Sequence, residues 1–288
     1  MANSIALFKK YVDLLDDVYK NAACSSVLDM DGALVQAGNN ANEIVIPKIE
    51  MDGLADYSRN GGYVQGNVKI THETVKFNYD RGRKFSVDAM DNEETAGIAF
   101  GKLASEFIRT KAVPEMDAVR FAAYSAISGI GSVTETISAV DGFISSVRAG
   151  VNALDEAEVP ADSRYLFVTP TLYNAVLDLN TYISKEVFNS FAGIIKVPQT
   201  RFYTAVDLLD GTTSDEEIGG YKKASGAADI NYMIVHKPAV IQFGKHTVSK
   251  VIAPENNPDA DAYLFTYRAY GLTDAYENKA AGIYCSHK

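Results

Sequence analysis

The sequence predicts an α+β protein, and three observations support this prediction. Apolar residues recur at helical spacing near the amino terminus and again over residues 92–127. Residues 43–88 form a long polar segment with strand patterning, called the arm below. The second half alternates helical and extended stretches. Because a two-stranded ribbon is marginally stable alone in water, the arm needs another surface to lie on, and a second copy of the chain is the expected one.

The composition excludes several classes of protein. The chain has 288 residues, of which 47% are hydrophobic and 22% charged, as in ordinary globular domains. With 27 basic and 37 acidic side chains, the formal charge is −10. Strong phosphate-driven binding of nucleic acid is therefore not expected. Cys24 and Cys285 form no disulfide framework, and no signal peptide or membrane-spanning run occurs.

Residues 3–21 are predicted to form an amphipathic helix. Ile5, Phe8, Val12 and Leu15 recur at spacings of three and four, which places them on one face. Such a helix could pack on its own core or on a neighbouring copy, and the sequence does not distinguish these two.

The arm is predicted to be a ribbon with a turn at its far end. Residues 43–51 are rich in β-formers but include Pro47, which indicates an edge or irregular strand. Residues 52–66 are rich in Gly, Asp and Asn and are predicted to form the tip.

The return strand of the arm changes its apolar face along its length. Val68 and Ile70 point one way, whereas Val75 and Phe77 have the opposite parity, so a bulge or turn near residues 72–74 is predicted. Residues 80–83 are predicted to break the strand, which continues through residues 85–88.

The long helical stretch over residues 92–127 has a start signal and an interruption. Asp91 or Asn92 can cap its first turn, where acidic residues are favourable. Pro114 is predicted to break or kink the helix and restart it. The segment 128–131 is predicted to end it.

The second half is predicted to combine helices with short strands. Helices are expected over residues 133–154 and 170–179. The extended stretches are expected at residues 165–168, 194–197, 205–209, 230–235, 263–270 and 281–285. A hairpin around Gly244 is predicted to join residues 238–243 to residues 247–252.

No motif for catalysis, cofactor binding or metal binding is present. The glycine-rich segments 60–66 and 128–132 lack the spacing and the strand–helix context of nucleotide-binding loops. Acidic groups such as Asp259 and Asp261 could bind a hard cation, but a solvated loop is the favoured interpretation. The Cys285-x-His287 pair is a weak metal signature. No cofactor is therefore predicted, and the chain is not predicted to be an enzyme.

The order of these segments resembles the major capsid proteins of tailed bacteriophages with the HK97-type fold. The similarity lies in residues 80–88, which end the arm, and in Asp91-Asn92-Glu93-Glu94-Thr95, which opens the helix. It extends to Val113-Pro114-Glu115-Met116-Asp117 and to the closing segments 267–275 and 278–284. The resemblance covers nearly the whole chain; each motif is loose, and their order is the specific feature.

The resemblance implies an HK97-like capsid fold with an N-terminal arm, an extended β-hairpin loop, a long spine helix, a peripheral domain and an axial domain. The implied boundaries are 1–42 for the N-terminal arm, 43–90 for the extended loop, 91–127 and 236–288 for the peripheral domain, and 128–235 for the axial domain. Pentamers and hexamers would form an icosahedral head enclosing double-stranded DNA, and the extended loop would lie on the adjacent subunit.

The resemblance also implies partners and contact residues. A separate scaffolding protein is expected because the chain enters its first helix within a few residues of Met1. A portal, a possible decoration protein and weakly contacted packaged DNA are expected too, with assembly in the bacterial host cytoplasm, localisation to the virion and no covalent crosslink. The candidates for contacts between subunits are Ile5, Phe8, Val12, Asp56, Tyr57, Arg59, Tyr63, Arg81, Arg83, Lys84, Glu93 and Glu94.

Two alternatives remain at this point. An encapsulin-type nanocompartment shell has the same fold and encloses a cargo enzyme instead of a genome. A soluble α/β enzyme with an unrecognised site is the more remote alternative.

Overall fold

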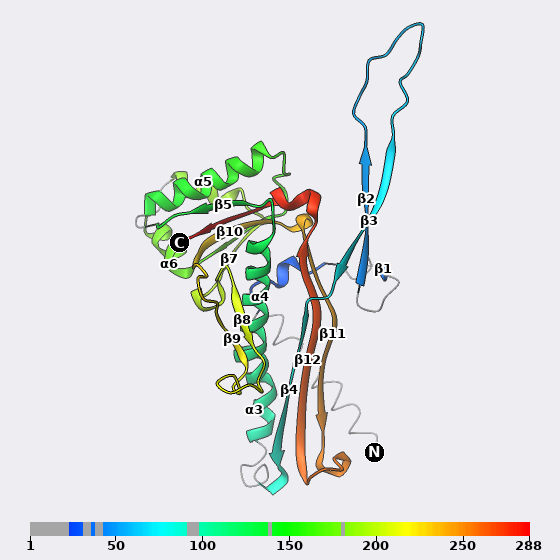
Figure 1. Ribbon diagram of the computed structural model, residues 1–288. Helices are drawn as coiled ribbons and strands as arrows, with labels where there is room; N and C mark the ends of the chain where they lie inside the picture. The colour runs from blue at the N-terminus through cyan, green and yellow to red at the C-terminus, as the bar shows by residue number, and fades with distance from the viewer. Residues whose placement is uncertain (1–22, 31–35, 38–42, 91–97, 138–139, 180–181) are drawn as a thin grey trace.

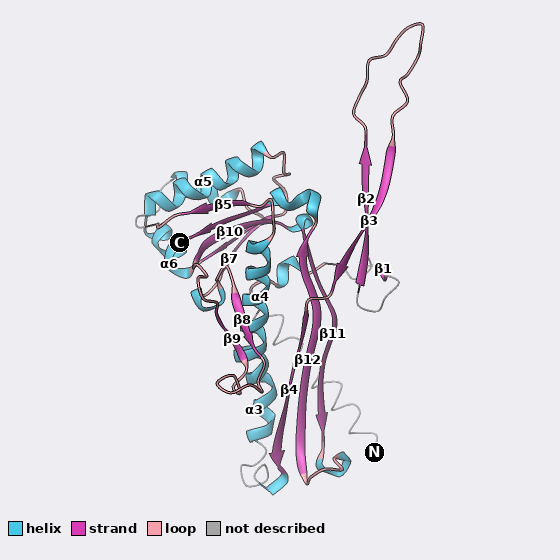
Figure 2. Cartoon of the chain, viewed as in Figure 1, coloured by secondary structure: helices cyan, strands magenta, loops and turns pink. Residues whose placement is uncertain are grey.

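The chain folds into a mixed α+β structure with three visible parts. The computed structural model describes residues 23–30, 36–37, 43–90, 98–137, 140–179 and 182–288. Figure 1 shows a long ribbon that projects from an elongated body, with a rounded lobe of helices and strands beside that body. The alternation of helices and sheets (Figure 2) confirms the predicted α+β class. The predicted helix over residues 3–21 lies outside the described residues.

The ribbon is the predicted arm. Its sheet has the order β1-β2-β3, made by Gln36–Ala37, Glu43–Met51 and Val68–Lys76. The short strand β1 pairs only with Ile44 and Val45. Pro47 therefore lies where β2 has a neighbour on one side only, which is a position that tolerates proline.

The elongated body is a sheet with a helix along one face. The sheet has the order β11-β12-β4, made by Val240–Ile252, Ala262–Ala275 and Tyr79–Asp88. The helix, called the spine, consists of α3 (Ile98–Phe107), a π-helical turn (Ile108–Ala112) and α4 (Val113–Ala126). Phe265, Tyr267 and Ala269 of β12 pack against Ile108 and Met116 of the spine.

The predicted break or kink at Pro114 is confirmed in part, because α4 starts at Val113 with Pro114 in its first turn, but the rod is not broken. The helix continues through Pro114, which occupies the first turn of α4. A proline ring in a regular α-helix collides with the carbonyl four residues earlier. The wider π-helical turn at Ile108–Ala112 comes directly before α4, where such a collision would fall, so the rod stays continuous.

Two predicted interruptions of strands are wrong. Strand β4 runs straight through residues 80–83 and pairs with β12 along its length. A Cβ atom on Gly82 would lie 2.8 Å from the backbone oxygen of Tyr267, so glycine here permits close strand approach. Strand β11 is likewise continuous, and its register shifts between Gly244 and His246. A bulge, not a hairpin turn, therefore explains that glycine.

The lobe is a five-stranded sheet covered on both faces. Its strand order is β5-β13-β10-β6-β7, made by Gly131–Thr134, Ile283–His287, Ile230–His236, Arg164–Val168 and Gly193–Lys196. Leu166, Val168 and Ile234 face the helices α5 (Val140–Glu156), α6 (Pro170–Leu179) and α7 (Tyr182–Asn189). Alternate residues such as Phe167 and Met233 face Phe121 and Tyr124 of α4. The spine therefore contributes to the core of both the body and the lobe.

The predicted helix over residues 133–154 begins too early. Its first residues belong to β5, which pairs in parallel with β13, and α5 starts at Val140. Tertiary pairing with a strand from the far end of the chain overrides the local helical pattern. Helix α7 was not predicted. Strand β9 (Gly220–Lys223) was not predicted either, and it pairs with β8 (Val206–Leu209), which was.

Candidate assembly surfaces

The base of the arm is fixed to the body by a small apolar cluster. Ile44 of β2 and Val75 of β3 are 4% and 6% exposed. They pack against Ile241 of β11 and Leu272 of β12. The base of the arm is thus part of the folded monomer.

The outer half of the arm has an apolar face with no partner among the described residues. Ile49 pairs with Ile70, and Met51 pairs with Val68, which places all four side chains on one face. Their exposed fractions lie between 55% and 71%. Most of the exposed large apolar side chains of the described residues lie between positions 49 and 70. An apolar surface of this kind usually marks an interface.

The opposite face of the outer arm is charged. Lys48 pairs with Thr71, and Glu50 pairs with Lys69 at an Nζ–Oε2 distance of 4.0 Å. The arm therefore has two different faces, and the outer apolar face is not the face that packs on the body at its base.

The predicted bulge near residues 72–74 is wrong for an instructive reason. Strand β3 pairs with β2 from Val68 to Lys76 with no register shift. The apolar side chains change from one face of β3 to the other between Ile70 and Val75 without any bulge. Val75 points at the body, whereas Ile70 points away from it on the other face.

The tip of the arm is a compact turn with two aromatic rings. Ser58 and Gly62 bond to each other through their backbones, and Gly62 has a φ of 77°. The rings of Tyr57 and Tyr63 lie 4.9 Å apart, and both side chains are exposed. Asp52 closes the tip by accepting a hydrogen bond from the backbone of Asn67 at 2.8 Å.

Arg81 holds the β8–β9 hairpin against the spine within one chain. Its Nε lies 2.8 Å from Glu115 Oε1, and its second nitrogen donates to the backbone oxygens of Leu209 and Gly220. Tyr79 also donates to Glu115, and burial together with that carboxylate raises the pKa of Tyr79.

Arg83 and Lys84 differ in how they are used. Arg83 donates to the backbone oxygen of Glu217 at 3.1 Å, beside Gly211 and Gly219. Both glycines have positive φ, and a Cβ on Gly211 would lie 2.6 Å from the Arg83 guanidinium. Lys84 is exposed on β4.

A buried carboxylate connects the spine, the lobe and the segment before the arm. Asp117 of α4 is fully buried. It accepts hydrogen bonds from the backbones of Cys24 and Ser25 at 3.0 and 3.1 Å, and from the Ser25 hydroxyl at 2.6 Å. It also lies 3.2 Å from Arg201. Four donors from two segments therefore converge on this one carboxylate. Arg120 of the spine donates in turn to the Ser25 hydroxyl at 2.9 Å.

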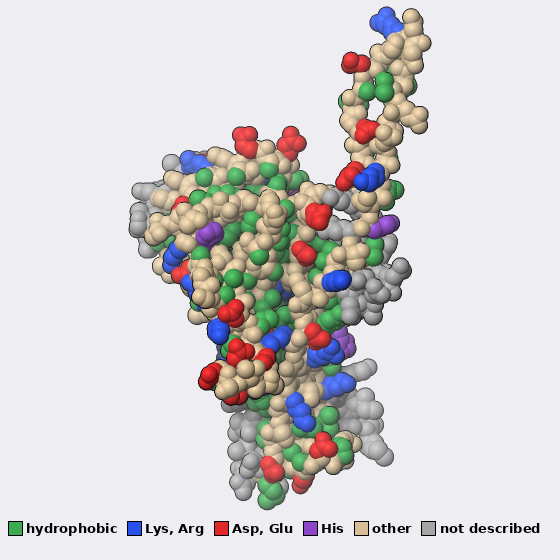
Figure 3. Space-filling model, in the orientation of Figure 1, with side chains coloured by type: hydrophobic (Ala, Val, Ile, Leu, Met, Phe, Trp, Pro, Cys, Tyr) green, Lys and Arg blue, Asp and Glu red, His purple; other side chains and the backbone are tan. Residues whose placement is uncertain are grey.

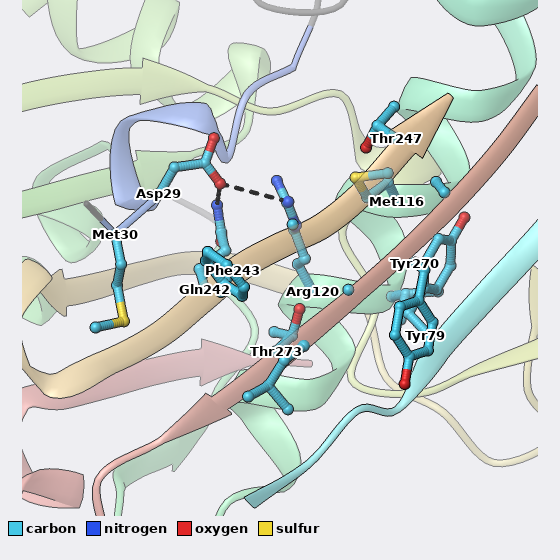
Figure 4. A pocket seen from close by; sticks show the side chains of 15 residues that line it. Asp29, Met30, Tyr79, Met116, Arg120, Gln242, Phe243, Thr247, Tyr270 and Thr273 are labelled. Atoms are coloured by element: carbon cyan, nitrogen blue, oxygen red, sulfur yellow. Dashed lines mark hydrogen bonds and ion pairs between the residues drawn. The ribbon is translucent and has the colours of Figure 1, made fainter. Parts of the chain in front are cut away.

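The same junction borders a cavity of about 400 Å³ between α4, β11 and β12 (Figure 4). Gln242 donates to Asp29 at 2.7 Å and to the Ser25 carbonyl, and Arg120 lies 3.4 Å from Asp29. Tyr124 donates to Gln242 at 2.7 Å. These polar groups are satisfied by one another, and the rest of the cavity wall is largely apolar.

Both cysteine thiols have raised pKa values. Burial raises the pKa of Cys285 to about 12, and burial with Asp117 nearby raises that of Cys24 to about 11. Neither is an activated thiol. Among the described residues no group of three His, Cys, Asp or Glu side chains is placed to hold a metal. No helix of the described part of the chain is long and apolar enough to cross a membrane.

The predicted contact residues fall into three groups. Asp56, Tyr57, Arg59 and Tyr63 lie exposed at the arm tip. Arg81 and Arg83 make hydrogen bonds within the chain, whereas Lys84 is exposed and forms no ion pair with the described residues. Ile5, Phe8, Val12, Glu93 and Glu94 lie outside the described residues. The apolar face of the outer arm was missed, although the alternation of Ile49 with Met51 and of Val68 with Ile70 was visible in the sequence.

Comparison with solved structures identifies the fold. The capsid of Staphylococcus phage Andhra matches with a TM-score of 0.56 at 9% identity, covering 90% of this chain and 84% of that one. The capsid of cyanophage P-SCSP1u matches with a TM-score of 0.54 at 10% identity over 86% and 84%. A virus-like particle from Pyrococcus furiosus matches with a TM-score of 0.59 at 11% identity over 97% and 99%.

The chain therefore has the fold of phage capsid structures, as the sequence resemblance predicted. No protein-family model matches the sequence, and no curated protein matches it either. At these low identities the likeness defines the fold, and function has to be argued from the surfaces.

Proposed function

We propose that this chain is the major capsid protein of a tailed phage, with an HK97-like arrangement in which pentamers and hexamers form an icosahedral head around double-stranded DNA. The observation that carries this proposal is the exposed apolar face of Ile49, Met51, Val68 and Ile70, on which no other part of the described chain packs. Burying it on a neighbour would contribute about 1 kcal/mol or more per side chain. A structural role, without catalysis, follows.

The arm suits a contact between copies because its base packs on the body whereas its outer half is exposed. The base is held by Ile44 and Val75, so the outer half is presented in a fixed direction. In the proposed shell, residues 43–90 form the extended loop lying on the adjacent subunit. Residues 91–127 and 236–288 form the peripheral domain, and residues 128–235 the axial domain. The exposed tip residues Asp56, Tyr57, Arg59 and Tyr63 are the proposed outer contacts.

The same assignment implies further partners. A scaffolding protein, a portal and a decoration protein are proposed on the basis of the fold class alone. Assembly would take place in the host cytoplasm, and the shell would become part of the virion.

The decisive test is assembly of a variant altered on the apolar face alone. The double variant Ile49→Thr and Ile70→Thr changes two exposed residues, so the free energy of unfolding should shift by less than about 1 kcal/mol. Particles seen by electron microscopy for the wild type should be lost. The control variant Lys48→Ala and Thr71→Ala alters the opposite face and should assemble. Normal particles from the first variant, or no particles from the wild type under any condition, would overturn the proposal.

A nanocompartment shell of the encapsulin type is the second candidate. It is favoured by the match to a virus-like particle over 97% of this chain and 99% of that one. The contents of particles isolated from their native source distinguish the two. Genome-length DNA supports the phage head, and a tightly bound enzyme supports the nanocompartment.

A further inference from the structure

One face of the body sheet carries a row of basic side chains. The register places Lys250, Thr266 and Lys84 side by side across β11, β12 and β4. The next rows along the same face contain Arg268 and then His246 with Tyr270. The cationic side chains of these rows are exposed. A chain with a net charge of −10 thus concentrates cations on one flat surface.

Several of these cations have no acidic partner in the described part of the chain. Arg268 is paired with Asp80 at 2.6 Å. Lys245, at the bulge, lies 4.9 Å from the ring of Phe77 and 5.9 Å from that of Tyr270. Lys84, Lys250 and His246 have no such counterpart among the described residues.

The parts of the described chain that pack on this sheet cover the surfaces around the basic face. The opposite face of the sheet is covered by the spine, through Phe265 and Tyr267. The base end of the same face is covered by the arm, through Phe243 and Leu272. The remaining stretch beyond Tyr270 carries the charges. In Figure 3, Lys and Arg side chains lie among Asp and Glu side chains over the lower half of the molecule, where these strands lie in Figure 1.

The far end of the same sheet is acidic. Asp88 ends β4, and Glu255, Asp259 and Asp261 lie in the connection between β11 and β12. All four side chains are exposed, and residues 251–267 contain no Lys or Arg. None of the four forms an ion pair within the described residues. Figure 3 shows acidic side chains at this lower end.

We propose that the acidic end of one copy docks on the basic face of a second copy, as an inter-subunit contact separate from the arm. The inference rests on the proposed shell function and adds a second contact to it. Within the described residues, Lys84 and Lys250 of the face and the four carboxylates of the acidic end form no ion pair, and each surface supplies the charge that the other lacks. Screening over about 8 Å at physiological salt means that the two surfaces must touch to neutralise each other. A nucleic acid partner would account for the basic face only and would leave the acidic end unexplained.

Charge reversal with rescue tests this contact. The face variant is Lys84→Glu with Lys250→Glu, and the end variant is Asp259→Lys with Asp261→Lys. Each should raise the protein concentration needed for assembly about tenfold or more, because like charges would meet. The chain carrying all four substitutions should recover assembly, since the complementarity is restored in reverse. The control variant Lys111→Glu with Arg148→Glu has the same change in charge as the face variant and should assemble normally.

The outcomes separate the two proposals. If the wild type forms particles and the face and end variants do so equally well, the second contact is wrong and the shell function stands. Loss of assembly without rescue in the fourfold variant also overturns the docking. Normal assembly of the face variant with weakened DNA binding would assign the basic face to nucleic acid. If the wild type forms no particles, both proposals fail.

Discussion

Asp117 shows how one buried side chain can connect separate parts of this fold. It sits on the spine and joins the segment at Ser25 to Arg201 of the lobe through short hydrogen bonds. A buried carboxylate is tolerated only where donors surround it. In the sequence Asp117 looked like an acidic residue in the first turn after a helix break. Its burial could not be predicted, because its partners lie 84 to 93 positions away.

Replacing Asp117 with Asn should therefore strongly destabilise the monomer. Arg201 would lose its ion pair with Asp117 in a partly buried site, and the amide could not accept all the hydrogen bonds that the carboxylate accepts. A loss of about 3 kcal/mol in the free energy of unfolding is expected, measured by urea denaturation. Asp80→Asn is the matched control, because the pair that Asp80 forms with Arg268 is exposed and should contribute little. Equal effects of the two substitutions would contradict this interpretation of Asp117.

The raised pKa values of the two thiols predict that both react slowly at neutral pH. With its pKa raised to about 11, Cys24 holds a much smaller thiolate fraction at pH 8 than a free cysteine, and Cys285 at about 12 a smaller one still. Disulfide-exchange labelling at pH 8 should therefore be about a hundredfold slower than in the unfolded chain for Cys24. Because the thiolate is the reactive form, labelling of Cys24 should accelerate as the pH rises toward its pKa of about 11. Fast labelling of the native protein at pH 8 would show that the site around Ser25 and Asp117 opens readily.

At the scale of elements, the arm illustrates what sequence patterning can and cannot resolve. The strands, the tip and the need for an external surface were predicted from the polar character of residues 43–88. The change of face between Ile70 and Val75 was misinterpreted as a bulge because only one core was assumed. The structure packs Val75 against the body and leaves Ile70 exposed on the opposite face of the ribbon.

The outer arm should accordingly be sensitive to protease before assembly and protected afterwards. Its trypsin sites are Lys48, Arg59 and Lys69, and few contacts of the monomer would oppose local opening there. Limited trypsin digestion of free subunits should cut first within residues 48–69, as mass spectrometry of the fragments would show. Assembled particles should resist the same treatment. Cleavage at equal rates in both states would mean that the arm gains no partner on assembly.

Local glycines and prolines misled the prediction at the same scale. Gly82, Gly244 and Pro114 each look like the end of an element, yet β4, β11 and the spine pass through them. Gly82 permits close approach of a neighbouring strand, Gly244 lies at a bulge, and Pro114 follows a π-helical turn. Local signals of this kind identify a special backbone position and do not say whether the chain turns there.

At the scale of the whole molecule, the charge distribution was hidden by the composition. Both halves of the chain are acidic, so no basic surface was expected. The register of three strands, two of them far from the third in sequence, brings Lys84 beside Thr266 and Lys250. Pairing of this kind depends on the fold and is absent from any count of charges. The order of elements, in contrast, was enough to predict the fold, because a helix, a polar arm, a long helix and a closing sheet form an unusual sequence of parts.

The net charge leads to a last prediction about what empty shells retain. A shell of many copies at −10 each repels a polyanion overall, and the small basic face on each copy would be neutralised by its neighbour's acidic end. Particles assembled from this chain alone should therefore contain little nucleic acid, and genome entry would require active packaging. The absorbance ratio at 260 and 280 nm of purified particles should be that of protein, and nuclease treatment should leave it unchanged. The face variant is the control, because replacing Lys84 and Lys250 would change the absorbance ratio only if these lysines bind nucleic acid. A high ratio that persists after nuclease digestion would show that the inner surface grips DNA directly.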